Sequence, residues 1–181
     1  MTFVLKNKKY LQPIFWGLIL LGFIFINKHI KLAKIQSNSM SPTIKKGEYV
    51  IYINRTSNIK KGDILLFKQP GNKRILIKRC WSVPKDSIFY YHKKFYNQLG
   101  HRFKKEAVKI IIPYKGMLIG DGDLNKYNEL IKKEDLDFKH PIQFNENYYY
   151  LRGDNILNSI DSRIFGLVKE SDVIGKVLFK L

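Results

Sequence analysis

One apolar segment near the N-terminus constrains this chain more than any other feature. It runs from Leu11 to Ile26 as LQPIFWGLILLGFIFI, contains no charged residue and has lysines on both sides. About 20 apolar residues span the hydrocarbon core of a bilayer, so this run is short and needs the stems of its flanking lysines to reach outward. We therefore expect residues 11–27 to form a transmembrane anchor.

A cleaved export signal is the alternative interpretation of this segment. The residues that follow it read NKHIKLAKIQ, in which lysines interrupt any small-residue cleavage pattern of the A-x-A kind. An uncleaved anchor is therefore favoured. The orientation of the anchor stays open at this point, because basic residues on both flanks give the positive-inside rule nothing to discriminate.

The charge of the chain indicates what kind of partner it meets. There are 33 lysine and arginine residues against 15 acidic ones, which gives a formal charge of +18. Such a charge attracts phosphate polymers or an anionic bilayer surface. The sequence contains no RNP pattern, zinc-finger spacing or basic recognition helix. We therefore expect contact with anionic membrane lipid and none with nucleic acid.

Residues that bind metals are few and scattered. Cys80 is the single cysteine, so the chain can form no internal disulfide. Its four histidines include no H-E-x-x-H motif and no close pair. We expect no metal site and no cofactor. The oligomeric state is not determined by the sequence, and a monomer is the working expectation.

Beyond the anchor, short runs of β-branched and aromatic residues recur between turn signals such as Lys61-Gly62-Asp63 and Gln69-Pro70-Gly71-Asn72. This spacing predicts a mainly β fold with an antiparallel sheet as the catalytic body. The predicted strands cover residues 49–53, 64–67, 74–81, 88–91, 108–112, 147–151 and 173–179.

A polar segment in the middle of the chain differs in character from the rest. Residues 123–135, DLNKYNELIKKED, have an acidic first turn, apolar residues at helical spacing and late lysines, which predicts a short helix. We expect residues 92–143 to form a small inserted subdomain that contains this helix. The β-rich catalytic core then consists of residues 28–91 and 144–181.

Two separate regions supply a candidate serine nucleophile and a lysine that could activate it. Soon after the anchor comes Ser37-Asn38-Ser39-Met40-Ser41-Pro42-Thr43, which on its own is an ordinary turn. A serine becomes a nucleophile when a base removes its proton, and without a suitable histidine that base is an uncharged lysine. Burial lowers a lysine pKa toward neutrality. Lys78 lies in a predicted strand and shares a face with Leu76 and Cys80, although a surface lysine is the alternative.

A third region, from Gly153 to Arg163, carries a strong turn signal followed by polar side chains. Gly-Asp-Asn favours a turn, and Asp161 with Arg163 can form an ion pair that holds a loop in one shape. A purely structural turn is the alternative. A site that uses an unprotonated lysine also needs a group to orient the amine, and the hydroxyl of Ser159 is suitable.

Taken together, these regions resemble one family, the bacterial type I signal peptidases. The pattern of that family runs S-x-S-M-x-P-T, then a strand with I-K-R, then G-D-N-x-x-x-S-x-D-S-R-x-x-G. This chain has SNSMSPT, then KKGDILLF and ILIKR, then GDNILNSIDSRIFG, in the same order behind an apolar anchor. Each fragment alone is weak, but the ordered set is specific.

The resemblance implies a membrane-bound serine endopeptidase that removes N-terminal signal peptides from exported precursor proteins. It places the nucleophile at Ser39, the general base at Lys78 and the oxyanion-hole hydroxyl at Ser37, with the Ser39 backbone N–H as the second donor. Ser159 corresponds to the residue that orients the lysine. The residues that shape the site are Gly153, Asp154, Asn155, Asp161 and Arg163.

The same resemblance implies a topology and a substrate preference. The catalytic domain should lie outside the cytoplasm, on a single-pass anchor in the cytoplasmic (inner) membrane, with residues 1–10 as a cytoplasmic N-terminus. Substrates of the family have small residues at the first and third positions before the cut, which implies shallow apolar pockets. The candidates for lining these pockets are Ile35, Gln36, Met40 and Ile77.

This chain departs from the family pattern directly after the base strand. Members usually continue I-K-R-V-x-G-x-P-G-D, whereas this chain has Ser82 and Lys85 where glycines are usual. We therefore expect a change in the turn after Lys78, which affects the substrate pockets more than the serine and lysine pair.

Other interpretations have sequence features that count for or against them. Ser57-Asn58-Ile59-Lys60 matches the S-x-x-K motif of penicillin-binding enzymes, but the S-D-N and K-T-G motifs are missing. Self-cleaving repressors also use serine and lysine, but they usually carry a helical DNA-binding domain. Two alternatives stay open. One is a specialised protease that matures a single conjugation or pilus protein, and the other is a catalytically silent, basic scaffold at the membrane surface.

Overall fold

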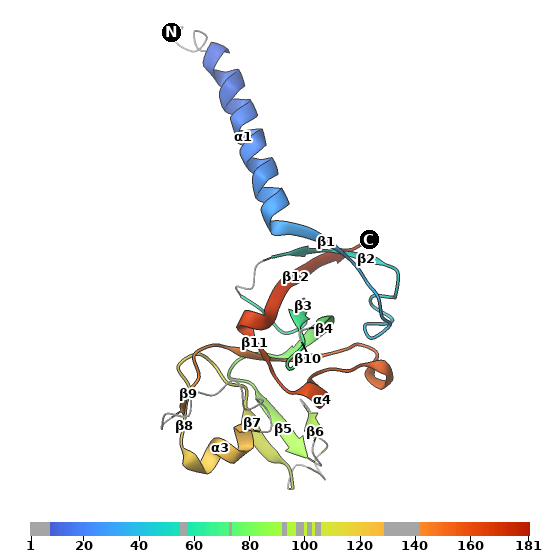
Figure 1. Ribbon diagram of the computed structural model, residues 1–181, viewed down its shortest axis with the longest axis vertical. Coiled ribbons are helices and arrows are strands. Elements are labelled where there is room, and N and C mark those ends of the chain that lie inside the picture. Colours follow the sequence, from blue (N-terminus) through green and yellow to red (C-terminus); the bar gives the residue numbers. More distant parts are fainter. Residues whose placement is uncertain are drawn as a thin grey trace.

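The structure is a computed structural model that describes residues 8–54, 58–72, 74–91, 94–96, 100, 103, 106–128 and 142–181. It joins one long N-terminal helix to a body made of three antiparallel β-sheets (Figure 1). In chain order the elements are α1 (Lys8–His29), β1 (Ile30–Lys34), β2 (Tyr49–Ile53), β3 (Ile64–Lys68), β4 (Ile75–Ser82), β5 (Ser87–Tyr91), β6 (Lys94–Tyr96), β7 (Val108–Ile111), β8 (Leu118–Ile119), α3 (Asp121–Asn128), β9 (Ile142–Gln143), β10 (Tyr148–Arg152), η2 (Ile156–Asn158), α4 (Ser162–Phe165), β11 (Val168–Lys169), η3 (Glu170–Asp172) and β12 (Val173–Lys180).

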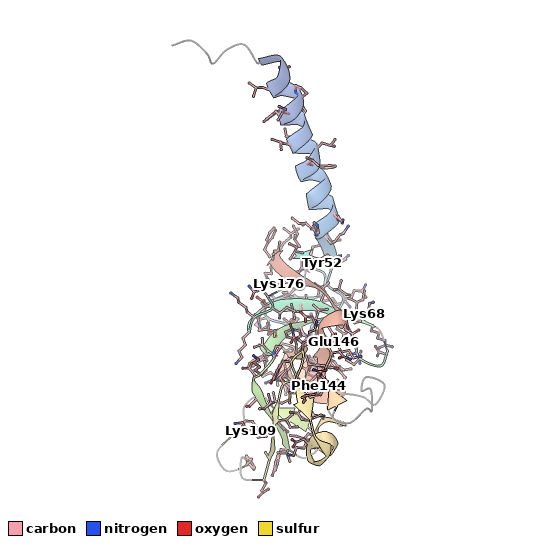
Figure 2. All side chains as sticks on the ribbon, turned by 90° about the vertical axis from the view of Figure 1, so that its left-hand side faces the viewer. Tyr52, Lys68, Lys109, Phe144, Glu146 and Lys176 are labelled. Atoms are coloured by element: carbon pink, nitrogen blue, oxygen red, sulfur yellow. The ribbon has the colours of Figure 1, made fainter. Side chains whose placement is uncertain are left out.

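Helix α1 projects away from one end of the body (Figure 1), and the side chains drawn on it in Figure 2 point outward. Its large apolar side chains between Leu11 and Phe23 are all exposed. Its last turn carries Lys28 and His29, which suit the negative end of a helix dipole. By length and hydropathy together, none of the helices in the described part of the chain meets the requirements for crossing a membrane.

The largest sheet has seven strands in the order β1-β2-β12-β3-β4-β10-β11. Strand β4 therefore lies inside the sheet, between β3 and β10. Its register pairs Lys78 with Leu65 on β3, and Arg79 with Arg152 on β10. Because β4 has a neighbouring strand on each side, the backbone of Lys78 is held in place in the middle of the sheet.

The strand predictions are confirmed in type and place. Strand β2 covers the predicted run 49–53, and the other six predicted strands begin within one residue of their expected starts. Strands β1, β6, β8, β9 and β11 were not predicted. β1 is a lysine-containing strand at the sheet edge, and the other four have only two or three residues, too few for an alternating pattern.

The small sheets differ in part from the expected domain division. Strand β5 belongs to a three-stranded sheet, β6-β5-β7, and β8 pairs with β9. The expected boundary after residue 91 therefore falls inside the β5–β6 hairpin. The reason is that β5 pairs with β6 and β7, which both belong to the segment expected to be the insertion. Helix α3 covers the start of the predicted helix 123–135, and the remainder of that helix lies outside the described residues.

Three clusters of buried apolar side chains form the core. The first lies between the small sheet, α3 and β10, and includes Ile88, Ile110 and Phe144. The second packs Phe67 and Leu151 around the centre of the main sheet. The third fixes the chain between β1 and β2 against that sheet, and its buried members are Ile35, Met40, Ile44, Val50, Leu66 and Ile77.

Lys85 occupies the altered turn after β4. Its φ of 75° lies in the left-handed region, where glycine is favoured over other residues. The turn is held by hydrogen bonds from the Val83 N–H to the Asp86 carboxylate, 2.8 Å, and from the Lys85 N–H to the Ile112 carbonyl, 3.0 Å. The lysine therefore adopts a backbone conformation in which a glycine would be less strained.

Candidate active site

The turn that carries Ser39 is anchored by apolar side chains and backbone hydrogen bonds. Met40, next to Ser39, and Ile44, at the end of the turn, are fully or almost fully buried in the third core cluster. The Ile44 N–H donates to the Met40 carbonyl, 2.9 Å, and the Ser41 N–H donates to the Asn38 carbonyl, 3.0 Å. The turn is therefore a fixed support, and Ser39 as a residue is 7% exposed.

Lys78 reaches this serine from the interior strand β4. The residue is 2% exposed, and its Nζ lies 2.7 Å from Ser39 Oγ and 2.9 Å from the Ile77 carbonyl oxygen. The alternation predicted for the strand holds at this point, because Leu76 and Lys78 line the same hollow. The structure thus brings together two residues that are 39 positions apart in sequence.

The surroundings of Lys78 favour its neutral form. Burial disfavours the charged ammonium and lowers the pKa of Lys78 from 10.5 to about 8, while the negative charge of Asp161 partly opposes this effect. A fraction of the amine is therefore unprotonated at neutral pH. An unprotonated amine at 2.7 Å from a hydroxyl can accept the proton of that hydroxyl.

Asp161 is a fully buried carboxylate that organises the loop beside the pair. Its oxygens accept hydrogen bonds from the Gly153 N–H at 3.0 Å and from Ser159 Oγ at 2.9 Å. Arg163 donates to it through Nε at 2.8 Å and Nη2 at 2.9 Å. Burial acts to raise the pKa of Asp161, but these hydrogen bonds outweigh burial and the pKa is lowered. The Asp161–Arg163 ion pair predicted from sequence is present.

The Gly-Asp-Asn turn connects this loop to both the serine and the lysine strand. Asp154 forms a two-point ion pair with Arg79, with distances of 2.9 Å to Nε and 2.7 Å to Nη2. The Asn155 N–H donates to the Ser39 carbonyl oxygen at 3.0 Å. The turn therefore fixes the position of Ser39 relative to the residue that follows Lys78.

Gly153 is required at its position by the space around it. A Cβ built on Gly153 would lie 2.5 Å from the carbonyl oxygen of Ser39 and would overlap the side chain of Ser159. Real Cβ atoms do not approach backbone oxygens so closely. The close contact between the loop and the serine turn therefore depends on a residue without a side chain.

Ser37 and Ser159 both lie near the pair, but each makes a different contact. Ser37 Oγ is 3.3 Å from Ser39 Oγ, so a second hydroxyl adjoins the predicted nucleophile. Ser159 lines the same hollow as Lys78, but its hydroxyl donates to Asp161 and makes no direct hydrogen bond to the lysine amine. Its predicted role in orienting the amine therefore has an indirect route, through the charge of Asp161.

A hollow of about 430 Å³ contains Ser39 and Lys78. The four predicted pocket residues are not among its walls. Ile35, Met40 and Ile77 are buried in the third core cluster because their side chains fill the space under the serine turn, and Gln36 is exposed. The residues that line the hollow are Ser37, Ser39, Leu76, Lys78, Leu157, Asn158, Ser159, Ile160 and Ile164.

Sequence reasoning missed two kinds of residue in this site. Arg79 was read only as part of a motif, although its guanidinium binds Asp154, the Gly62 carbonyl and Thr43. The apolar residues Leu157, Ile160 and Ile164 had no role assigned. They occupy positions that the third motif leaves unspecified, and their apolar nature in a polar turn was the available signal.

A lysine amine in contact with a serine hydroxyl can support acyl transfer, because the amine can accept and then return the proton of that hydroxyl. A buried amine beside a serine hydroxyl, with a second hydroxyl next to it, fits the class of serine peptidases in which lysine replaces histidine. In the described part of the chain, no group of three or more histidine, cysteine, aspartate or glutamate residues could hold a metal ion.

Comparison with known proteins defines the family. Residues 8–181 match the family described as signal peptidase, peptidase S26, and the chain belongs to this family. It is 27% identical to signal peptidase I of Aquifex aeolicus, over 88% of this chain and 78% of that protein. It is 28% identical to signal peptidase I T of Bacillus subtilis, over 96% and 86%. For signal peptidase I of Streptococcus pneumoniae the identity is 26%, over 92% and 91%.

Among solved structures, a signal peptidase I from Enterococcus faecalis aligns with 68% of this chain and 98% of that chain, at 24% identity and a TM-score of 0.35. The family and the named relatives make this chain a hydrolase, a signal peptidase of the serine protease type. Its substrates are accordingly precursor proteins that carry signal peptides.

Proposed function

We propose that this chain is a membrane-anchored signal peptidase that cleaves precursors with Ser39 as nucleophile and Lys78 as general base. The observation that carries the proposal is the 2.7 Å distance between Lys78 Nζ and Ser39 Oγ, with both side chains buried. A lysine that served only for solubility would keep its ammonium in water. An amine withdrawn from water and aimed at a hydroxyl fits proton transfer instead.

In this mechanism the reaction proceeds through an acyl-enzyme. Lys78 takes the proton of Ser39 as the hydroxyl oxygen attacks the scissile carbonyl, and the resulting ammonium gives that proton to the leaving amine of the mature protein. A water molecule then loses a proton to Lys78, attacks the Ser39 ester and releases the signal peptide. The Ser37 hydroxyl and the Ser39 backbone N–H are the proposed donors to the oxyanion.

The loop around Asp161 is proposed to hold the Lys78 amine and the turn that carries Ser39 in fixed relative positions. Gly153 allows the loop to approach the Ser39 carbonyl, and Asn155 donates to that oxygen. Ser159 and Arg163 hold the Asp161 carboxylate. Because Asp161 carries a negative charge near Lys78, it tunes how readily the amine gives up its proton.

We further propose that α1 anchors the enzyme in the cytoplasmic membrane. Its exposed apolar side chains and its basic last turn support this assignment, as does the charge of +18, which favours an anionic lipid surface. In the proposed topology residues 1–10 lie in the cytoplasm and residues 28–181 outside it. The seven-stranded sheet then forms the catalytic core, and the insertion includes β5 together with β6 and β7, because these three strands form one small sheet.

Cleavage of a precursor tests the assignment of the pair. The full chain in detergent is compared with Ser39→Ala and Lys78→Met, and with Lys68→Met as a matched control, because Lys68 is an exposed lysine on the neighbouring strand β3. The two site variants should lose cleavage and the control should retain it. Equal cleavage by all four proteins would reject the pair. An inactive wild type would instead favour the silent-scaffold alternative.

Cell fractionation tests the anchor independently of the chemistry. The full chain should remain in the membrane fraction after alkaline extraction. Protease added to cells whose outer layers have been opened should digest the body but leave a short N-terminal fragment. Release of the protein by alkali, or a body protected from external protease, would contradict the proposed topology.

A further inference from the structure

Three exposed aliphatic side chains at the hollow have no part in the mechanism above. Leu157 is 99% exposed, Ile160 59% and Ile164 69%, and all three line the hollow that contains Ser39 and Lys78. We call these three residues the apolar rim. Scattered single apolar residues on a surface need no explanation, but three that converge on one concave site do.

The apolar rim is built on a fixed support. Arg163 Nη2 donates to the Ile156 carbonyl at 2.9 Å and to the Ser159 carbonyl at 3.4 Å, which closes the loop from inside. The Asn158 N–H donates to the Asn155 carbonyl at 3.2 Å. With Asp161 buried at its centre, these hydrogen bonds fix the backbone that carries the rim, so the positions from which its exposed side chains project are set before a substrate binds.

The residues of the apolar rim occupy positions that the motif of the family leaves unspecified, whereas the residues that hold the loop occupy fixed positions. In G-D-N-x-x-x-S-x-D-S-R-x-x-G, the fixed positions of this chain include Gly153, Ser159 and Asp161. Leu157, Ile160 and Ile164 occupy unspecified positions between and after them. These three side chains can therefore differ between enzymes without altering the hydrogen bonds that hold the loop, which suits a role in substrate choice.

We propose that the apolar rim binds an aliphatic or aromatic side chain of the precursor within about three residues of the cut bond, and so makes such precursors preferred substrates. This inference rests on the proposed function. An extended chain advances about 3.3 Å per residue, so a side chain two or three residues from the reacting carbonyl lies some 7–10 Å away, at the edge of the site. A small residue at the cut leaves much of a 430 Å³ hollow for a larger neighbour.

The hollow favours a peptide over lipid as the occupant. The rim shares its walls with polar groups, namely the hydroxyls of Ser37 and Ser159 and the amide of Asn158. An extended peptide presents backbone polar groups and side chains together, and can satisfy both parts of such a surface. Acyl chains offer no hydrogen-bonding group to these walls, so covering the exposed Asn158 amide with them would cost free energy that a peptide avoids.

The test measures selectivity on a matched set of precursor peptides. Each peptide keeps small residues at the first and third positions before the cut, and carries either leucine or glutamine at the second position before the cut or at one of the three positions after it. The full chain in detergent is compared with Leu157→Gln, Ile164→Gln and the double variant. Leu118→Gln is the control, because Leu118 is a similarly exposed leucine (59%) on β8.

At one position or more, wild type and Leu118→Gln should cleave the leucine peptide about tenfold more efficiently, by kcat/KM, than the glutamine peptide. The double variant should reduce this ratio to near one. The position of the effect tells whether the contacting residue lies on the signal side or the mature side. A ratio near one in the wild type at every position would overturn the inference, as would a ratio that the rim variants leave unchanged.

Two further outcomes distinguish a peptide contact from a lipid contact, and a failure of the rim from a failure of the proposed nucleophile. If the rim variants keep the ratio but bind less well to anionic vesicles, the rim contacts lipid and the inference is overturned. The Ser39→Ala variant should cleave none of the peptides. If it cleaves them with the wild-type selectivity, the proposed nucleophile is wrong while the rim retains its role.

Discussion

The pH dependence of cleavage depends most directly on the environment of Lys78. Burial lowers the pKa of this amine to about 8, and Asp161 limits the decrease. The base is active only when unprotonated, so kcat/KM should rise with pH and level off once the amine is fully neutral. The unprotonated fraction is about 9% at pH 7 and about 91% at pH 9, for a pKa of about 8.

These fractions give a profile with a characteristic shape. The value of kcat/KM should increase about tenfold between pH 7 and pH 9 and then reach a plateau. An exposed lysine, with a pKa near 10.4, would instead give an increase of nearly a hundredfold over the same interval, with no plateau below about pH 11. The plateau therefore distinguishes a buried base from an ordinary lysine.

The assay is the initial rate of cleavage of one precursor at low concentration, in detergent, from pH 6 to pH 11. Stability at each pH is checked by returning samples to pH 8. A midpoint near 6.5, typical of an imidazole, would refute the assignment of Lys78, and so would a rate that still climbs at pH 11. Lys78→Arg should show no recovery at any pH, because a guanidinium stays protonated.

The same pKa has a consequence for stability. Between about pH 8 and pH 10.5 the unfolded state binds more protons at Lys78 than the folded state, so folding becomes more favourable as pH rises. Below about pH 8 both states are protonated, and the folded state carries the full cost of the buried charge, about 3 kcal/mol. Lys78→Met should therefore melt at a higher temperature than the wild type at pH 7, and the difference should shrink above pH 10.

Three further substitutions test the supports of the site. Gly153→Ala should lower melting temperature by the equivalent of about 1–3 kcal/mol and lower kcat, because its Cβ would meet the Ser39 carbonyl, whereas Gly122→Ala, with open space around it, should do neither. Asp154→Asn should cost about 1–3 kcal/mol by thermal unfolding, since it leaves Arg79 without its carboxylate, and an unchanged midpoint would contradict this. Lys85→Gly should be neutral or stabilising by up to about 1 kcal/mol, because glycine relieves the left-handed backbone, and clear destabilisation would show that the lysine side chain matters more than φ.

The sequence by itself determined the local structure and the chemical inventory. Strand β2 matches its predicted run because its β-branched and aromatic residues favour extended structure over five neighbouring positions. The serine, lysine and aspartate motifs could be read in order, and so could the class of reaction they suit. The strands with two or three residues could not be predicted, because such segments pair only when a partner strand is already in place.

Only the tertiary structure decided which side chains face the site and which fill the core. Ile35, Met40 and Ile77 are apolar and close to the motif residues, yet they pack beneath the serine turn, while Leu157 and Ile164 remain exposed at the hollow. The physical reason is that burial depends on the packing of distant segments. Lys78 contacts Ser39 only because β4 lies inside the sheet and the serine turn folds over it. The local sequence around either residue does not predict that contact.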